Sequence, residues 1–177
     1  MVTALAGCSP SPAEGSDADA VQPSLRVVSA PQSPPAVVPA AEADLDHATD
    51  FLLAWFEGLN YGFASGDADP LRATTSLACF TCAEWIKAVQ TQADTGTVRH
   101  GGLIALDDAA LVGQDGSDFL FRASVVQQPG TLQAAGAAPT PVPAANSTEL
   151  VEIRVGLSTS LAEGRPRWVV KAIQPPS

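Results

Sequence analysis

The sequence predicts an α+β fold in which three N-terminal helices pack on a curved antiparallel sheet of about four strands. Apolar residues first recur at helical spacing, between residues 45 and 63, and later alternate with polar residues at strand spacing, from residue 119 onward. Helical and strand-like segments do not alternate along the chain, as they would in a parallel βαβ fold. We therefore expect all helices to precede the strands, which then form an antiparallel sheet.

The first helix is expected to begin near Ala41 and to end at Ser65-Gly66. Glycine readily adopts the left-handed conformation that ends many helices, and the acidic residues near the start suit the positive end of the helix dipole. One face of this helix is apolar and comprises Leu45, Ala48, Leu52, Trp55, Phe56, Leu59 and Phe63.

Two shorter helices are expected next. The second begins at Asp69-Pro70, with Asp69 as the N-cap and Pro70 as the first helical residue. The third begins at Thr81-Cys82-Ala83-Glu84, which has the spacing of a capping box: the Thr hydroxyl and the Glu carboxylate would each accept a hydrogen bond from a backbone N–H. It fades at residues 94–96.

Four strands are expected after the glycine pair at residues 101 and 102, with a turn at residues 113–116. Alternation and turn residues place them at residues 103–112, 119–126, 149–157 and 167–173. Between the second and the third strand, residues 127–147 are rich in Ala and Pro and are expected to form a long mobile loop.

Leu5-Ala6-Gly7-Cys8 is typical of a lipobox, the end of a lipoprotein signal, whose cysteine is acylated and becomes the first residue of the mature protein. Such a lipid anchors a protein to a membrane without spanning it. The residues before Cys8 are fewer than a basic region and an apolar stretch of about 7 to 15 residues require. We therefore expect that the start of translation lies upstream of Met1 or that the signal has been trimmed.

Residues 9–40 are expected to be a disordered tether. They are rich in Pro, Ser and Ala and contain no aromatic residue, so they cannot bury enough apolar surface to offset the entropy of ordering the chain. The sequence thus divides into a truncated signal with its lipobox (residues 1–8), the tether (9–40) and an α+β domain (41–177).

Composition limits the partners of the chain. Its 177 residues include 19 acidic and 9 basic residues, for a net charge of −10, and no cluster of Lys or Arg. This balance argues against binding of nucleic acid. No apolar run approaches the roughly 18 residues of a membrane span, so attachment to the membrane is expected through a lipid on Cys8, at the extracytoplasmic face.

Cys79 and Cys82 form the sharpest local motif. In an exported protein such a pair is most simply a disulfide, here a clip between the second and third helices. A redox function is the alternative, because the start of a helix lowers the pKa of a thiol. No strand precedes the pair, however, as it does in thioredoxin-like folds. A zinc site would need His47 and His100, which lack ligand spacing, so no metal is expected.

Acid–base chemistry would need a desolvated carboxylate or histidine in a pocket. His47 is expected on the polar side of the first helix, and His100 in a flexible connector from which it could reach a pocket mouth. The acidic candidates are Asp50, Glu57, Asp67 and Asp69. The last two are better explained as turn and cap residues, and we assign no catalytic residue and no cofactor.

Four aromatic residues could line an apolar pocket, the usual site for a small ligand. They are equally what the core of a domain of this size requires, although the Tyr hydroxyl needs a polar partner. These residues are Trp55, Tyr61, Phe63 and Trp85.

The chain resembles a family of uncharacterised actinobacterial lipoproteins with the cystatin-like, cone-shaped fold of nuclear transport factor 2. The resemblance spans about residues 41–173, and the Ala/Pro-rich stretch at 129–146 departs from a compact version of that fold. It implies a long helix in the concave face of the sheet, and no reaction. The residues that carry it, besides the lipobox and tether, are Phe56, Tyr61, Gly66-Asp67, Leu71, Cys79-Phe80-Thr81-Cys82 and Trp85-Ile86.

Taken together, the sequence predicts a lipid-anchored module of the cell envelope that acts in binding or assembly, without catalysis. Its partner would be another envelope protein or a small apolar ligand. A small enzyme that performs acid–base chemistry in its pocket is the alternative, and a thiol–disulfide protein that uses Cys79 and Cys82 is a minor one.

Overall fold

A computed structural model describes residues 33–35, 43–142, 149–159 and 166–176, and the structural statements below concern those residues. Cys8 and nearly all of the expected tether lie outside them. The chain forms three helices and then seven strands: α1 (Leu45–Ser65), α2 (Asp69–Ala73), α3 (Phe80–Asp94), β1 (Val98–Gly101), β2 (Ile104–Asp115), β3 (Asp118–Gln127), β4 (Gly130–Gln133), β5 (Thr140–Val142), β6 (Glu149–Thr159) and β7 (Pro166–Gln174).

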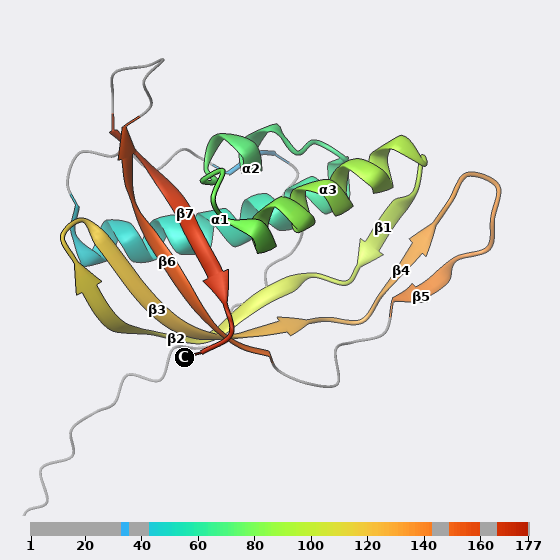
Figure 1. Ribbon diagram of the computed structural model, residues 1–177. Helices are drawn as coiled ribbons and strands as arrows, with labels where there is room; N and C mark the ends of the chain where they lie inside the picture. The colour runs from blue at the N-terminus through green and yellow to red at the C-terminus, as the bar shows by residue number, and fades with distance from the viewer. Residues whose placement is uncertain (1–32, 36–42, 143–148, 160–165, 177) are drawn as a thin grey trace, which may run out of the picture.

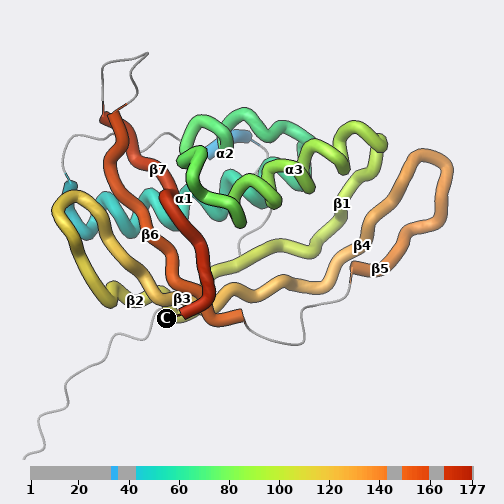
Figure 2. Tube along the Cα trace, viewed as in Figure 1, coloured from blue at the N-terminus to red at the C-terminus, as the bar shows by residue number. Residues whose placement is uncertain are grey.

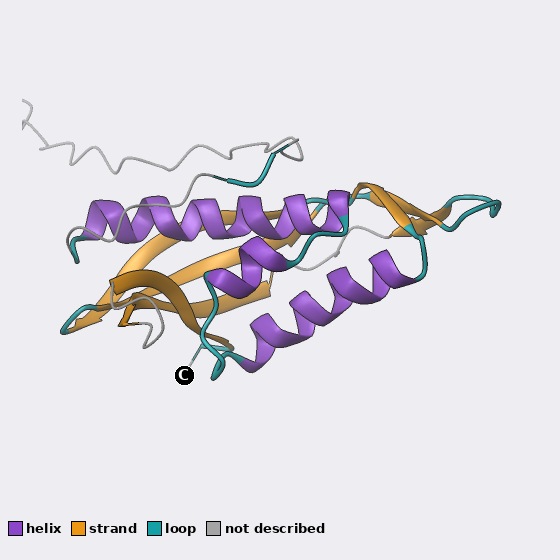
Figure 3. Ribbon diagram, turned by 90° about the horizontal axis from the view of Figure 1, so that it is seen from above, coloured by secondary structure: helices purple, strands orange, loops and turns teal. Residues whose placement is uncertain are grey.

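The α+β class is confirmed, with all described helices before all described strands. The strands form two antiparallel sheets, in the orders β2-β3-β6-β7 and β1-β4-β5; the first has four strands, but the second was not expected, so a total of about four strands is too low. The helices pack against the four-stranded sheet, and the three-stranded sheet projects beyond the end of α3 (Figures 1 and 3). We call this three-stranded sheet the wing.

The apolar face of α1 supplies much of the core. Six of its seven expected members are buried, and only Leu45 is substantially exposed. The helix begins at the N-cap Asp44, whose carboxylate accepts a hydrogen bond from the backbone N–H of His47 at 2.8 Å; this bond lowers the pKa of Asp44. It ends where expected, at Gly66, which has a φ of 79°.

The caps of the two shorter helices differ from those expected. The N-cap of α3 is Cys79, whose sulfur accepts the backbone N–H of Cys82. The hydroxyl of Thr81 instead donates to the carbonyl of Ile173 in β7, at 2.9 Å, so the predicted capping box is wrong. Asp69 lies inside α2 rather than at its N-cap, and its carboxylate binds Arg72.

The core lies between α1 and one face of the four-stranded sheet. Alternate residues of the central strands point toward it, as their period-two pattern predicted. The buried residues on this face are Phe119, Phe121 and Ala123 of β3 and Val151, Ile153 and Val155 of β6. On β7, Trp168 packs between Phe51 of α1 and Phe119, with ring centroids 6.0 Å apart in both pairs.

The two sheets share one long, bent β-ribbon. Gly101 pairs with Gly130 in the wing, and Ile104 pairs with Gln127 in the core sheet, so the register is the same on both sides of the bend. Between these pairs, the N–H of Gly102 donates to the carbonyl of Pro129 at 2.9 Å. Figure 2 follows the two chain segments side by side around this bend.

The segments expected to be a mobile loop at 127–147 and a flexible connector at His100 therefore contain strands, and both predictions are corrected there. The reason is that the wing is held by backbone pairing between distant segments. None of the residues of β1, β4 or β5 is fully buried. Without a buried face, these strands leave no apolar alternation in the sequence.

Three glycines allow the ribbon to bend between the Gly101–Gly130 pair and the Ile104–Gln127 pair, a bend that we call the corner. Gly101 and Gly102 have φ values of 68° and 65°, which residues with a Cβ rarely adopt. Gly130 faces them at close range: a Cβ on Gly130 would lie 2.3 Å from the backbone nitrogen of Gly102.

The buried side chain of Asn60 fixes the corner to α1. Its amide nitrogen donates to the carbonyl of Ile104, and its amide oxygen accepts the N–H of the same residue, both at 2.8 Å. Asn60 is 2% exposed, so water could not reach the backbone groups of Ile104 if these two hydrogen bonds were lost, and the loss would be destabilising. The first residue of β2 is thereby held against the helix.

Replacing Asn60 with Leu should destabilise the protein by about 3 kcal/mol, because it leaves both backbone groups of Ile104 buried without a partner. Urea unfolding would measure the change. The matched control is Gln114→Leu, which removes an exposed amide and should change stability by less than about 0.5 kcal/mol. Equal effects of the two substitutions would contradict the role given to Asn60.

Gly130→Ala should destabilise the corner by about 1–3 kcal/mol, because its Cβ has no room against the backbone of Gly102. Gly113→Ala is the control, since a Cβ there meets only side-chain atoms of Leu120 at 3.8 Å or more. Thermal unfolding of both variants would measure the difference. A neutral Gly130→Ala variant would show that the two strands do not approach closely.

A candidate binding groove

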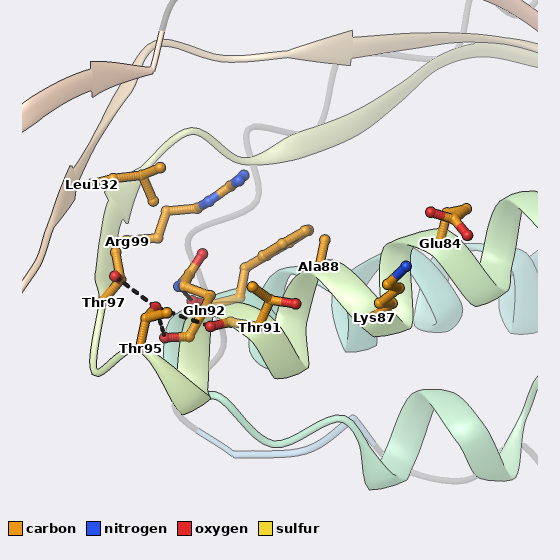
Figure 4. Close-up of a pocket in the computed structure, with 10 residues that line it drawn as sticks. Glu84, Lys87, Ala88, Thr91, Gln92, Thr95, Thr97, Arg99 and Leu132 are labelled. Carbon is orange, nitrogen blue, oxygen red and sulfur yellow. Dashed lines mark hydrogen bonds between the residues drawn. The ribbon is translucent and has the colours of Figure 1, made fainter.

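A groove of about 430 Å³ lies between α3 and the wing (Figure 4). Phe63, from the last turns of α1, forms part of its lining. The helix and the wing supply opposite walls of the groove.

One wall of the groove is a single face of α3. Its residues recur at steps of three and four, from Glu84 at one end, through Lys87 and Ala88, to Thr91 and Thr95. The opposite side of α3 carries Cys82 and Val89, which are buried in the core. The apolar side of α3 therefore packs into the core, and its opposite side, with polar and apolar residues mixed, faces the groove.

The other wall is one face of the wing. Arg99 of β1 and Leu132 of β4 are directly paired across the strands, and Thr97 lies two residues before Arg99. Directly paired residues point to the same face of a sheet and neighbouring residues of one strand point to opposite faces, so Arg99 and Leu132 share a face and His100 lies on the other. Thr97, Arg99 and Leu132 line the groove, whereas His100 is exposed and is not among its lining residues.

Arg99 is the most constrained charged group in the groove. Its guanidinium carbon lies 3.9 Å from the centre of the Phe63 ring, and its Nη1 donates to the carbonyl of Gly102 at 3.1 Å. Its Nε is buried and has no hydrogen-bond partner among the described residues. Burial lowers the pKa of the guanidinium from its ordinary value, although an arginine remains charged at neutral pH.

The groove concentrates positive charge in an acidic protein. Outside the groove, Arg72 pairs with Asp69, Arg122 with Glu152 and Lys171 with Asp118, whereas Arg154 and Arg167 form no ion pair with a described residue. Neither Arg99 nor Lys87 forms an ion pair within the part of the chain that the structure describes. Both line the groove, with one carboxylate, that of Glu84, at its end.

The structure separates the four aromatic residues proposed to line a pocket. Phe63 lines the groove. Trp55 and Trp85 pack with Phe56 in the core, with ring centroids 5.2 to 6.0 Å apart, and the indole N–H of Trp55 donates to the Thr75 hydroxyl. Tyr61 is half-buried on α1 and lies outside the groove lining.

The acid–base candidates lie apart from the groove as well. The Asp67 carboxylate accepts the backbone N–H of Asp69, His47 contacts Asp44, and Asp50 is exposed on α1. Glu57 borders a small cavity of about 30 Å³ beside β2. In the described ranges, no three His, Cys, Asp or Glu side chains are grouped so that they could hold a metal ion.

Cys79 and Cys82 are joined by a disulfide at the start of α3. Both residues are buried, with exposures of 1% and 0%. A thiol–disulfide protein needs at least one sulfur that a partner thiolate can attack, so the burial of both favours the structural clip. None of the described helices is both long and apolar enough to cross a membrane.

Sequence reasoning missed Arg99, Leu132 and the groove face of α3. Arg99 and Leu132 are 33 positions apart, and only the pairing of β1 with β4 brings them together. The one available signal was Thr97 and Arg99 at strand spacing, which is too short to predict a strand.

Comparison with known protein families identifies a family whose function is not known. Residues 14–170 match a family described as a family of unknown function (DUF6318). No curated protein matches the chain. A solved structure, the intermembrane space region of the chloroplast protein ARC6, is similar over 78% of this chain and 100% of that chain. At 14% identity and a TM-score of 0.44, this similarity carries no argument about function.

Replacing both Cys79 and Cys82 with Ala should lower the free energy of unfolding by about 2 kcal/mol, the value expected for so short a closed loop. Urea unfolding would measure it. In the unmodified protein, glutathione should leave the bond intact, because both cysteines are buried. Ready reduction by glutathione, measured by thiol labelling of the folded protein, would instead favour the redox function.

Proposed function

The chain belongs to this family of unknown function, which supplies no reaction or ligand, and we propose from its own residues that it is a lipid-anchored, extracytoplasmic binding protein without catalytic activity. The groove between α3 and the wing is its binding site. The observation that carries the binding role is the groove itself, which combines an aromatic residue with two cations, Arg99 and Lys87, neither of which forms an ion pair with a described carboxylate.

The lipid anchor is proposed on Cys8. Support comes from the small apolar pattern Leu5-Ala6-Gly7-Cys8 and from the Pro-, Ser- and Ala-rich stretch that separates it from α1. A flexible chain of that length has a root-mean-square reach of about 30 Å. The domain would therefore work close to a membrane surface while keeping its groove accessible.

The extracytoplasmic location is proposed on chemical grounds. Disulfides persist in oxidising compartments and are rare in the cytosol. The bond between Cys79 and Cys82 fits such a compartment, and it uses both cysteines other than Cys8.

We also propose that the domain is a variant of the cone-shaped fold of nuclear transport factor 2, as in the actinobacterial lipoproteins that the sequence resembles. The packing of the long α1 against the curved sheet supports this assignment (Figure 1). The wing is then an addition to the cone, and the groove lies between this addition and α3.

Intact mass spectrometry of the protein extracted from the membranes of its natural host tests the proposed location. We expect a chain that begins at Cys8, carries acyl groups and gains two hydrogens on reduction. A Cys8→Ala variant of the complete gene is the control and should lack the acyl mass and leave the membrane fraction. A cytosolic chain that retains the residues before Cys8 and has free thiols would overturn the proposal.

A further inference from the structure

We propose that the groove between α3 and the wing binds a small organic monocarboxylate. The carboxylate would bind Arg99, and the apolar body would lie over Phe63, Ala88 and Leu132. The inference rests on the groove as the binding site of the proposed function, and it does not depend on the lipid anchor.

Arg99 defines the head-group site. A guanidinium binds a carboxylate through two parallel N–H···O bonds, which adds geometric selectivity to charge attraction. Nη1 of Arg99 already donates to the carbonyl of Gly102, and Nε is buried, so the carboxylate would bind the remaining N–H groups of Nη1 and Nη2. Stacking on Phe63 and the bond to Gly102 hold the side chain in place. Binding then loses little side-chain entropy.

The charges around the groove favour a ligand with one negative charge. Lys87 adds a second cation on the α3 wall, but the Glu84 carboxylate lies three residues away on the same face. The protein as a whole carries a net charge of −10. The groove therefore has two cations and one carboxylate, an excess of one positive charge that a single ligand carboxylate balances, whereas a dianion would leave a surplus negative charge near Glu84.

The apolar residues define the body of the ligand. Phe63, Ala88 and Leu132 come from α1, α3 and β4 and line the same groove. Its volume of about 430 Å³ falls in the range of about 300–1,000 Å³ that is typical of small-molecule sites. A separate cavity beside Arg99, lined by Asn60 and Gly102, measures only about 20 Å³ and is too small for an organic ligand.

Isothermal titration calorimetry of the full 177-residue chain with decanoate, below its micelle concentration, tests the inference. Decanoate should bind, and decanol, which keeps the chain and lacks the charge, should bind roughly ten-fold more weakly or worse. Decyl phosphate, as a dianion, should also bind more weakly than decanoate because of Glu84. Tighter binding of decyl phosphate or of decanol would overturn the assignment to a monocarboxylate.

Two variants locate the site. Arg99→Gln should weaken decanoate binding by roughly ten-fold to a hundred-fold, whereas Arg154→Gln removes the same charge from an exposed position on β6 and should change it less than two-fold. Ala88→Phe should fill the groove and abolish binding. Its control, Ala83→Phe, places the same ring at an exposed position of α3 outside the groove lining and should bind normally.

The variants keep the test decisive. If Arg99→Gln does not fold, the comparison of decanoate binding between Ala88→Phe and Ala83→Phe still tests whether the ligand occupies the groove. The inference is wrong if decanoate does not bind the wild-type chain, or if it binds Ala88→Phe as tightly as Ala83→Phe. Lipidation of Cys8 is measured separately, by mass spectrometry. If Cys8 is unmodified but decanoate binds, the proposed membrane location is wrong and the proposed ligand of the groove is still supported.

Discussion

The pair of hydrogen bonds between Asn60 and Ile104 determines where the β-ribbon leaves the core. The register between the two segments is continuous from the Val98–Gln133 pair to the Asp107–Ser124 pair, so the ribbon could run straight there, yet it bends beside α1. Asn60 occupies the backbone groups of Ile104 at that point. Phe63 lies one helical turn farther along α1, which brings its ring under Arg99 just beyond the corner. The two hydrogen bonds of Asn60 therefore fix the position of the groove as well as that of the sheet.

The groove is built on the least buried part of the described structure. No residue of β1, β4 or β5 is fully buried, whereas the central strands β3 and β6 each contribute several buried side chains. The wing thus adds little apolar burial and is held by the corner, by backbone pairing and by Arg99 on Phe63. Regions with few buried contacts open most readily. Their residues can also change with little effect on the core, which suits a surface whose role is selectivity.

Burial explains which elements the sequence predicted. The end of α1, the alternation in β3 and β6 and the disulfide pair followed from local patterns, because a buried face or a cap leaves residues at fixed spacing. The wing left no such pattern, since its strands bury no face. The cap of α3 was also misassigned, because Thr81 binds Ile173, a residue 92 positions away that no local rule can identify. The candidate site shares this limit: only Phe63 among the expected pocket residues lines the groove.

Packing alone does not account for Arg99. A Leu or Met side chain would cover the Phe63 ring without placing a charge in a half-buried site, and burial of a charge without a partner is unfavourable. The stacking on Phe63 recovers about 0.5–2 kcal/mol, and the bond to Gly102 satisfies one of several donors. An acidic chain has many carboxylates to pair with a cation, as Glu152 does with Arg122. Arg99 forms an ion pair with no carboxylate that the structure describes. Its charge faces the groove, where the carboxylate of a bound ligand can pair with it.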